Sequence, residues 1–377
     1  MRRPQVILAV AGALLIALTF TACSSETLSS LFPWRFTATG VGKFVYVANH
    51  NSGNASGYTI NASTGALTQI SGSPFPTGVA AGPTDVATDP LGKYVYILDD
   101  TGDVYGFSIN ATSGALTPVP GIDFPTSGTP VGLGVDPSGK FVYVSNSFGG
   151  IDAFTINAAN GDLTPVAGSP FSTGCEANEL AIHPSGTFLF VGDSECSDLH
   201  TFTINTTSGA LTPAAGSPIN SGSNPQGVAV DPSGKFVYVA LGSGNVNAFA
   251  VNATNGDLTL VAGSPFAAGS SPENIAVDPT GKFVYVTNRF SDNVSAYTIN
   301  ATTGALTPVA GSPFAAGGLP VGIAVDPSGK FVYVTNSDDN NVSAFAINAT
   351  TGALTPVAGS PFAAGSSPSG IAVSPPL

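Results

Sequence analysis

The chain repeats one pattern of apolar and polar residues from about residue 41 to its end. A unit begins with a short apolar stretch such as "VGIAVDP" (321–327), followed by a turn and an alternating stretch such as "KFVYVTN" (282–288). A third stretch, "NVSAYTI" (293–299), and a looser fourth, "LTPVAGSPF" (306–314), complete the unit. Short runs of β-branched and aromatic residues between Gly, Pro and Asn turns are typical of strands. Each unit is therefore predicted to contain four strands.

The units have a nearly constant length. A glycine in the turn after the first stretch recurs every 47 to 50 residues, at Gly42, Gly92, Gly139, Gly186, Gly234, Gly281 and Gly329. Four short strands in a unit of about 40 to 50 residues are the signature of a β-propeller blade. The repeat region thus predicts a propeller.

The two ends of the repeat region complement each other. Residues 42–49 supply a second strand that lacks a first one, and residues 369–377 supply a first strand that lacks a second. Seven copies of each strand are complete when the C-terminal strand joins the N-terminal blade, and this closure removes both exposed sheet edges. We predict an all-β, seven-bladed β-propeller with four-stranded blades over residues 41–377, with its ring closed in this way.

Composition agrees with this fold. The 377 residues include 46 Gly and 30 Pro, and 43% are apolar while 9% are charged, whereas a disordered chain has few apolar residues and high charge. The formal net charge is −13, and six basic residues share one turn position: Lys43, Lys93, Lys140, Lys235, Lys282 and Lys330. Because this distribution leaves no basic stripe for a phosphate backbone, we expect no nucleic-acid partner.

The first 22 residues have the pattern of a signal peptide. Arg2 and Arg3 precede the apolar run "VILAVAGALLIALTF", and "LTFTAC" resembles a bacterial lipobox ending at Cys23. We expect residues 1–22 to be a lipoprotein signal peptide, Cys23 the lipidated residue, and residues 23–40 a flexible tether. The protein would be extracytoplasmic and lipid-anchored to a bacterial membrane. Ser24, the residue after Cys23, favours the outer membrane or cell surface by the sorting rule for lipoproteins. An uncleaved anchor and an ordinary secretory signal are the alternatives.

Most chemically distinctive residues are predicted at one end of the propeller. The loops that enter each first strand and leave each second strand meet at one mouth of the central channel. We predict binding residues there: Asp85, Glu176, Glu179, Glu195, Glu273 and Arg289. The catalytic candidates are Glu176, Glu179, Asp193 and Arg289. The alternative is a solvated acidic rim, to which we also assign Asp99, Asp100, Asp103, Asp338 and Asp339. His183 falls on the opposite face, where we expect no catalytic role.

Two cysteines frame the most altered repeat, residues 174–196. In an antiparallel hairpin opposed residues have a constant index sum, and the pair 183/188 at the turn has the same sum as the pair 175/196. If this register holds, Cys175 and Cys196 face each other, to within a slip of about one residue. An extracytoplasmic location favours oxidation of such a pair, so we predict a Cys175–Cys196 disulfide.

The motif "YVTN" stands at residues 285–288 and 333–336, and the repeat region resembles the YVTN-type propellers of the seven-bladed lactonase family, which includes 6-phosphogluconolactonase. The resemblance implies lactone hydrolysis, which requires a base and a donor or cation for the developing oxyanion. It also implies histidines before an inner strand, but the equivalent stretch here, residues 175–178, reads Cys-Glu-Ala-Asn. Asp193 matches an Asp that commonly follows the second strand in the family.

Two functions follow from these residues. The acidic mouth favours a binding or scaffold role, with a small molecule, a saccharide or a protein as partner. The alternative is a lactone hydrolase of the 6-phosphogluconolactonase type, and the sequence does not decide whether catalysis occurs. We expect no organic cofactor, while a divalent cation at the channel mouth would suit the carboxylates.

Overall fold

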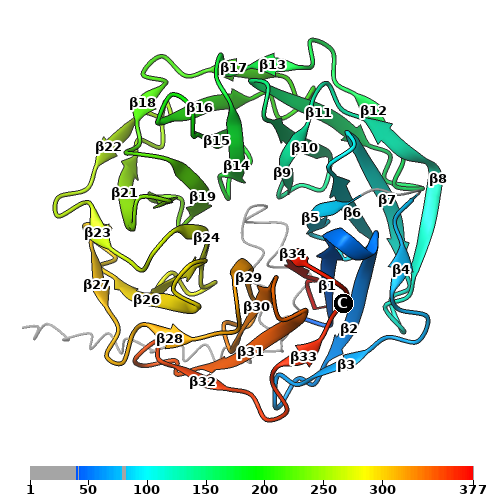
Figure 1. Cartoon of the computed structure of the whole chain (residues 1–377). Helices are drawn as coiled ribbons and strands as arrows, with labels where there is room; N and C mark the ends of the chain where they lie inside the picture. Colours follow the sequence, from blue (N-terminus) through cyan, green and yellow to red (C-terminus); the bar gives the residue numbers. More distant parts are fainter. Residues whose placement is uncertain (1–39, 41, 79–81, 377) are drawn as a thin grey trace, which may run out of the picture. The chain divides into compact units, whose positions relative to one another are not determined.

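The computed structural model describes residues 40, 42–78 and 82–376, in which the strands form seven antiparallel sheets arranged in a ring (Figure 1). The predicted all-β, seven-bladed propeller is confirmed. The predicted signal segment, Cys23 and residues 24–39 lie outside the described residues. Within the described ranges a single 3-10 turn, η1 (His50–Ser52), interrupts the β-structure, and no helix there is long and apolar enough to cross a membrane.

Each blade contains an innermost, a second, a third and an outermost strand. The innermost strands are β34 (Pro368–Val373), β5 (Pro83–Thr88), β9 (Pro130–Val135), β14 (Ala177–Ile182), β19 (Pro225–Val230), β24 (Pro272–Val277) and β29 (Pro320–Val325) for the first to the seventh blade. The second strands are β1 (Phe44–Asn49), β6 (Tyr94–Asp99), β10 (Phe141–Asn146), β15 (Phe188–Asp193), β20 (Phe236–Leu241), β25 (Phe283–Asn288) and β30 (Phe331–Asn336).

The third strands are β2 (Asn54–Ile60), β7 (Asp103–Ile109), β11 (Gly150–Ile156), β16 (Asp198–Ile204), β21 (Asn245–Val251), β26 (Asn293–Ile299) and β31 (Asn341–Ile347). The outermost strand is continuous in the second blade, as β8 (Leu116–Pro125). It is split into two short strands in the others: β3 (Leu67–Gln69) and β4 (Phe75–Pro76), β12 (Leu163–Pro165) and β13 (Phe171–Ser172), β17 (Leu211–Pro213) and β18 (Ile219–Asn220), β22 (Leu258–Leu260) and β23 (Phe266–Ala267), β27 (Leu306–Pro308) and β28 (Phe314–Ala315), β32 (Leu354–Pro356) and β33 (Phe362–Ala363).

The split explains why the fourth stretch looks looser in the sequence. A Gly-Ser-Pro turn lies at the break, and proline has no N–H to donate to a strand ladder. The serine side chain compensates: the Ser73 hydroxyl accepts the N–H of Gly57 at 2.8 Å, and the Ser169 hydroxyl accepts that of Ala153 at 3.0 Å. The third strand therefore keeps its hydrogen bonds across the break.

The ring closes through the two ends of the repeat region, as predicted. β34 pairs antiparallel with β1, with Val373 opposite Val45, Ala372 opposite Tyr46 and Ile371 opposite Val47. In Figure 1 these strands, red and blue, lie side by side. The first blade is thus built from both ends of the described chain.

The second strand of each blade is buried on both faces. All six residues of β1 are buried, and their side chains alternate between two neighbours. Phe44 and Tyr46 pack in a cluster with Val95 of the second blade. Val45 and Val47 pack with residues of the seventh blade such as Phe331. The core therefore lies between blades rather than within them.

Tyrosine hydroxyls also connect neighbouring blades. Each donates to the carbonyl of a glycine in the hairpin before the next blade's outermost strand: Tyr46 to Gly114, Tyr96 to Gly161, Tyr143 to Gly209, Tyr238 to Gly304, Tyr285 to Gly352 and Tyr333 to Gly65, at 2.7 to 3.1 Å. The glycine is required because its φ is positive, +75° at Gly65 for example. The Tyr333 bond joins the seventh blade to the first.

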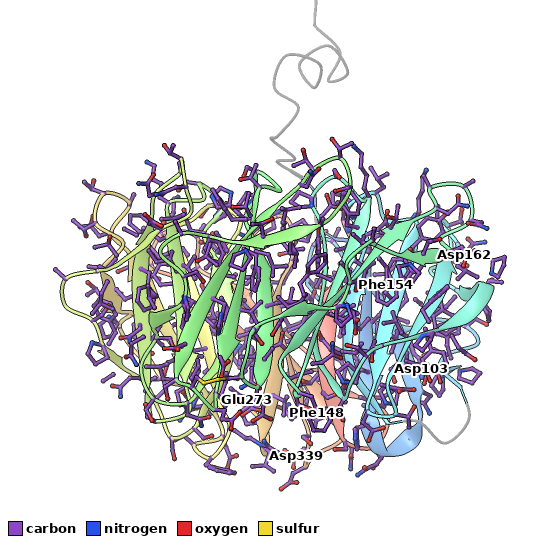
Figure 2. The ribbon with its side chains drawn as sticks, turned by 90° about the horizontal axis from the view of Figure 1, so that it is seen from above. Asp103, Phe148, Phe154, Asp162, Glu273 and Asp339 are labelled. Carbon is purple, nitrogen blue, oxygen red and sulfur yellow. A yellow bond between two sulfur atoms is a disulfide. The ribbon has the colours of Figure 1, made fainter. Side chains whose placement is uncertain are left out.

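The loops fall on two opposite faces of the ring. We call the face with the loops that enter the innermost strands the mouth face, and the face with the first-to-second-strand turns the turn face. Figure 2 shows Glu273, Phe148 and Asp339 along the mouth face, whereas Asp162 lies toward the turn face. Glu273 and Asp339, two of the acids that were expected at the mouth, thus lie on the mouth face.

Deletion of residues 369–377 is expected to destabilise the propeller strongly, because it removes β34 and exposes the second strand of the first blade. Ile371 alone is 8% exposed, and burial of such a side chain contributes about 1.5–3 kcal/mol. The matched control is deletion of residues 375–377, which leaves β34 intact. We expect the longer deletion to lower Tm by at least about 5 °C more than the shorter one in thermal unfolding followed by circular dichroism. Equal Tm values for both deletions would refute the importance of the closure.

Candidate functional site

The third residue of each innermost strand determines what lies near the axis of the ring. It is glycine in four blades (Gly132, Gly227, Gly322 and Gly370), and Asp85, Glu179 or Asn274 in the other three. The register to the second strand shifts at this point, between Ala177 and Leu180 in the fourth blade for example. The bulge leaves the N–H of the following residue without a ladder partner. A side-chain oxygen takes that role in the Asp85 and Asn274 blades, at 2.8 and 2.7 Å.

Asp85 and Glu179 lie on either side of Gly132 in β9. The second carboxylate oxygen of Asp85 accepts the N–H of Leu133 at 3.0 Å. From the other side, Glu179 reaches so close that an ideal Cβ built on Gly132 would lie 2.8 Å from Glu179 Oε2. A side chain at residue 132 would collide with that carboxylate. The second, third and fourth blades therefore bring two predicted site residues together around one glycine.

The two carboxyl groups hold protons more tightly than free ones. Burial raises the pKa of Asp85 to about 6. Burial also raises the pKa of Glu179 well above its ordinary range, and the negative charge of Asp85 raises it further, with a smaller contribution from Glu273. Two like charges in a poorly solvated site disfavour simultaneous ionisation. The pair therefore retains a proton at pH values where exposed acids have lost theirs.

Arg289 is paired with an acid rather than free. Its Nη1 atom lies 3.4 Å from Oε1 of Glu273, with the two side chains 39% and 23% exposed. Burial raises the pKa of Glu273, and the positive charge of Arg289 counteracts this rise. Arg289 also lies over the ring of Phe290, 5.9 Å from its centroid. Since Glu273 is itself near Glu179, the arginine belongs to the same end of the axis as the two axial acids.

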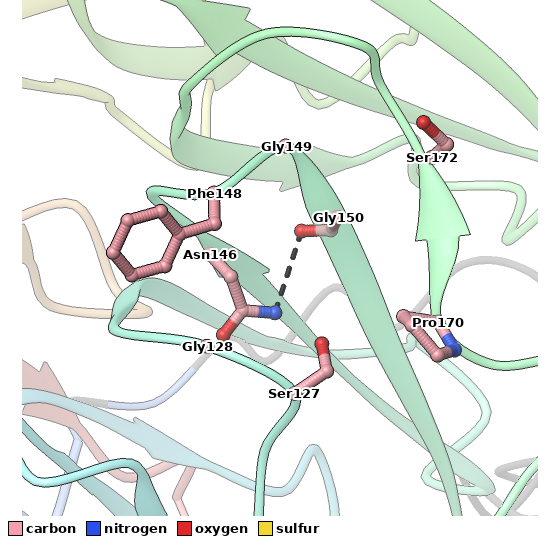
Figure 3. A pocket seen from close by; sticks show the side chains of 8 residues that line it. All are labelled: Ser127, Gly128, Asn146, Phe148, Gly149, Gly150, Pro170 and Ser172. Atoms are coloured by element: carbon pink, nitrogen blue, oxygen red, sulfur yellow. Dashed lines mark hydrogen bonds between the residues drawn. The ribbon is translucent and has the colours of Figure 1, made fainter.

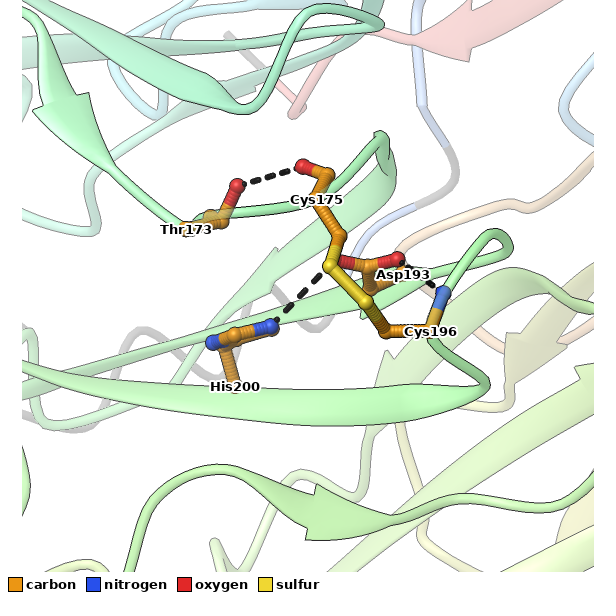
Figure 4. Close-up of a disulfide and its surroundings, with 5 residues drawn as sticks. All are labelled: Thr173, Cys175, Asp193, Cys196 and His200. Atoms are coloured by element: carbon orange, nitrogen blue, oxygen red, sulfur yellow. Dashed lines mark hydrogen bonds and ion pairs between the residues drawn. A yellow bond between two sulfur atoms is a disulfide. The ribbon is translucent and has the colours of Figure 1, made fainter.

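The predicted disulfide between Cys175 and Cys196 is present (Figure 4). The two Cα atoms are 6.1 Å apart, within the range that a disulfide requires. The hairpin register does not continue unchanged, because the bulge places Ala177 opposite Asp193, one position out of step with Leu180 and Val191. This shift is the one-residue slip that the prediction allowed.

Asp193 lies behind the disulfide (Figure 4). It is fully buried; Oδ1 accepts the N–H of Cys196 at 2.9 Å, and Oδ2 lies 3.4 Å from Nε2 of His200. In the first blade, Asn49 and Ser56 hold the corresponding positions and are joined by a hydrogen bond of 2.9 Å. Asp193 and His200 are therefore the fourth blade's version of a structural pair.

Glu176 and Glu195 lie on the same disulfide-linked hairpin. Glu195 is exposed and Glu176 is partly buried. Neither lies within 4.0 Å of a basic side chain in the described part of the chain, where the close contacts between acidic and basic side chains are His50–Asp100, His200–Asp193 and Arg289–Glu273. Their positions agree with a rim, while Glu179 lies deeper.

His183 lies on the turn face, away from the predicted mouth residues. Its Nδ1 accepts the N–H of Ser185 at 3.1 Å, so the other ring nitrogen carries the hydrogen and donates to the Gly234 carbonyl at 2.9 Å. Burial lowers the pKa of His183, which keeps the ring neutral. The histidine therefore connects the fourth blade to the fifth. In the fourth blade Phe190 stands in place of the tyrosine that makes this connection elsewhere.

Sequence reasoning misjudged one acid of the rim and missed a pairing. Asp99 was expected to be solvated but is fully buried, because it ends β6 and its Oδ1 accepts the N–H and hydroxyl of Thr101. Asp100, the next residue, is exposed and its Oδ2 lies 3.1 Å from Nε2 of His50 in the neighbouring blade. An alignment of the repeats would have marked Asp99 as the equivalent of the buried Asn49.

Carboxylates and thiolates are possible metal ligands. Over the described residues, the group of three that lies close enough together to hold an ion is Cys175, Asp193 and Cys196. Both sulfur atoms are bonded to each other in the disulfide, so neither is available as a thiolate ligand. This group is therefore not a candidate metal centre.

Replacement Glu179→Gln is expected to stabilise the protein at neutral pH. An acid whose pKa is raised on folding binds its proton more tightly in the folded state, so it lowers the free energy of unfolding as pH rises from about 4 through the folded pKa. Removing the buried charge should raise Tm at pH 7.5 by roughly 2–4 °C for each kcal/mol recovered, with little effect at pH 4.5. The matched control is Glu195→Gln on the exposed rim. The same Tm–pH slope in Glu179→Gln and the parent protein would show that the carboxyl is not buried as described.

Known proteins share this fold over nearly the whole described chain. A putative 6-phosphogluconolactonase from Bacteroides uniformis superposes with a TM-score of 0.76 at 19% identity, covering 88% of this chain and 99% of the other. A second putative 6-phosphogluconolactonase, from Bacteroides fragilis, gives 0.75 at 23% identity with 90% and 99% coverage. The periplasmic gluconolactonase of Pseudomonas aeruginosa gives 0.73 at 19% identity with 88% and 99% coverage. These identities establish the fold alone.

Sequence comparison identifies the family independently of these structures. No curated protein matches the chain at a significant level. The profile described as "Lactonase, 7-bladed beta-propeller" matches residues 42–128, 82–271 and 261–369, so that it spans all seven blades. The chain therefore belongs to the seven-bladed β-propeller lactonase family.

Proposed function

We propose that this lactonase-family propeller is an extracytoplasmic, lipid-anchored protein that binds a small polar ligand at the mouth of its channel. The ligand is an uncharged or cationic molecule, such as a saccharide or a divalent cation, held by Asp85, Glu179 and Glu273. Glu176 and Glu195 contribute at the rim. The observation that carries the proposal is the gathering of three carboxyl groups with raised pKa values from three blades near one end of the axis.

The charge of this site argues against an anionic ligand. Arg289 is the one arginine within the described residues, and its guanidinium is paired with Glu273. The six turn lysines belong to the opposite face. A phosphate or carboxylate would have to approach Asp85 and Glu179 without a free cation, which is electrostatically unfavourable. A hydroxyl group, in contrast, can donate to either carboxylate.

The anchored, extracytoplasmic location rests on the signal-like segment 1–22 and on Cys23, which lie outside the described residues. The Cys175–Cys196 disulfide supports it, because structural disulfides persist in oxidising compartments. An anchored propeller at the outer membrane or cell surface would present its mouth to extracytoplasmic small molecules.

Hydrolysis of an uncharged lactone is a second candidate, favoured by the Asp85–Glu179 pair. A carboxylate with a raised pKa is a stronger base than a free one, and could take a proton from water as the water oxygen bonds to the lactone carbonyl carbon. The ring C–O bond then breaks and the proton passes to the leaving alkoxide. Arg289 is the candidate donor for the oxyanion, although its guanidinium is paired with Glu273.

Measurements of ligand binding and of lactone hydrolysis distinguish these two functions. We expect the protein, purified from residue 24 onward, to bind neutral sugars or Ca²⁺ in isothermal titration calorimetry and not to hydrolyse 6-phosphogluconolactone above the uncatalysed rate. Glu179→Gln should weaken binding at least about tenfold, equivalent to about 1.4 kcal/mol. Glu195→Gln, an exposed rim acid, should change it by less than twofold.

Two outcomes would change the assignment. Turnover of glucono-δ-lactone that is lost in Glu179→Gln and rises with pH would establish the hydrolase. Turnover of 6-phosphogluconolactone that survives Glu179→Gln and Arg289→Ala would refute the proposed site altogether, because a cationic site elsewhere would then be required.

Cys23→Ser is expected to release the protein from the membrane. The thiol is the only group at residue 23 that a diacylglycerol transferase could modify, so its loss removes the anchor. In a bacterial host grown with labelled palmitate, the parent should carry label and sediment with membranes, while the variant should carry none. Label retained in Cys23→Ser, or equal release of both proteins, would contradict lipidation at this residue.

A further inference from the structure

A hollow on the mouth face of the third blade has none of the axial carboxylates in its lining (Figure 3). Its volume is about 210 Å³, smaller than the roughly 300 Å³ from which sites for drug-sized ligands begin, so it suits a single ring. It is lined among others by Ser127, Asn146, Phe148, Gly150, Pro170 and Ser172. The loop after β10 supplies the aromatic ring, and the loop between the second and third blades supplies Ser127.

The hollow exists because one side chain present in the sister blades is missing. The first residue of the third strand is Asn in four blades and Asp in two: Asn54, Asn245, Asn293, Asn341, Asp103 and Asp198. In the third blade it is Gly150. In the sixth blade the Asn293 side chain accepts a hydrogen bond of 2.7 Å from the amide of Asn288, the equivalent of Asn146. Gly150 leaves that volume empty.

A second change, separate from the missing side chain, leaves Asn146 with an unpaired acceptor. In the sixth blade, Oδ1 of Asn288 accepts the N–H of Gly269 at 3.0 Å. In the third blade the corresponding N–H, that of Ser127, donates instead to Asp152 at 2.7 Å. Oδ1 of Asn146 therefore has no hydrogen-bond partner among the described residues, although the side chain is only 1% exposed. A buried polar atom without a partner carries an uncompensated desolvation cost.

Phe148 places an aromatic surface beside this amide. The ring is 83% exposed, which is unusual for a phenylalanine that contributes nothing to the core. The equivalent ring in the sixth blade, Phe290, is 66% exposed, but there Asn293 fills the neighbouring space and Arg289 lies over the ring. Of these two blades, only the third combines an exposed ring, an open hollow and an unpaired acceptor.

We propose that the hollow beside Phe148 is a saccharide subsite, in which one sugar ring lies with its apolar face against Phe148 and donates a hydroxyl hydrogen to Oδ1 of Asn146. The hydroxyls of Ser127 and Ser172 flank the same ring. Sugars combine an apolar C–H face with hydroxyl donors, which is the pair of features that this hollow offers. Because Oδ1 is covered in the free protein, a local shift of the groups around Asn146 accompanies entry of the sugar. The subsite does not depend on the axial carboxylates.

The experiment uses methyl glycosides of glucose, galactose and N-acetylglucosamine as probes, observed by saturation-transfer NMR and titration calorimetry. Gly150→Asn restores the side chain of the sister blades; an ideal Cβ there has no heavy atom nearer than 3.5 Å, so the variant should fold. We expect Gly150→Asn and Phe148→Ala each to weaken binding of at least one probe tenfold or more. Phe290→Ala, the equivalent ring in the sixth blade, is the matched control and should leave binding unchanged.

Each contrary result overturns the subsite. Absence of binding for all three probes, or binding that Gly150→Asn leaves intact while its Tm equals that of the parent protein, shows that the hollow takes no sugar. Equal losses in Phe148→Ala and Phe290→Ala show a general effect of surface rings. Loss of the NMR signal in Glu179→Gln, with no loss in Gly150→Asn, places the sugar at the axis instead and supports the proposed function without this subsite.

Discussion

The second strand of each blade is apolar on both of its faces, and this constraint requires a ring. In β1, Phe44 and Tyr46 need one neighbouring blade and Val45 and Val47 need the other, so an open array would leave one such face in water at its end. Pairing of β34 with β1 satisfies both faces of the first blade. The chain achieves this with few charged groups because the contacts between blades are formed by aromatic and β-branched residues and by the tyrosine hydroxyls.

The close approach of the blades also determines which residues can lie near the axis of the ring. Innermost strands lie so near one another that glycine is the rule at their third residue, and a Cβ at Gly370 would lie 2.4 Å from Asp85 Oδ1. Asp85 and Glu179 fit because residue 132 between them is a glycine, which has no side chain to occupy that space. The cost is the burial of two carboxyl groups, which appears as their raised pKa values. Substitutions that work against stability in this way are characteristic of functional positions.

The altered fourth blade serves two purposes that its sequence does not separate. Glu179 belongs to the axis, with Asp85 and Glu273. The other unusual residues are structural: the disulfide and the Asp193–His200 pair hold the hairpin, and His183 bonds to Gly234 in the blade where Phe190 cannot donate a hydroxyl hydrogen. Loss of one contact between blades has thus been offset by another on the turn face.

The sequence by itself determined the strands, the number of blades, the closure of the ring and the partner of Cys175, because alternation and repeat spacing are local properties that regular hairpins preserve. It also assigned Glu179, Glu273 and Arg289 to one face. It did not determine that Asp85 meets Glu179 around Gly132, that Arg289 is paired with Glu273, or that Gly150 opens a hollow beside Phe148. Only the tertiary structure decided these contacts, because they join residues of different blades or depend on a bulge whose shift of one position no repeat pattern records.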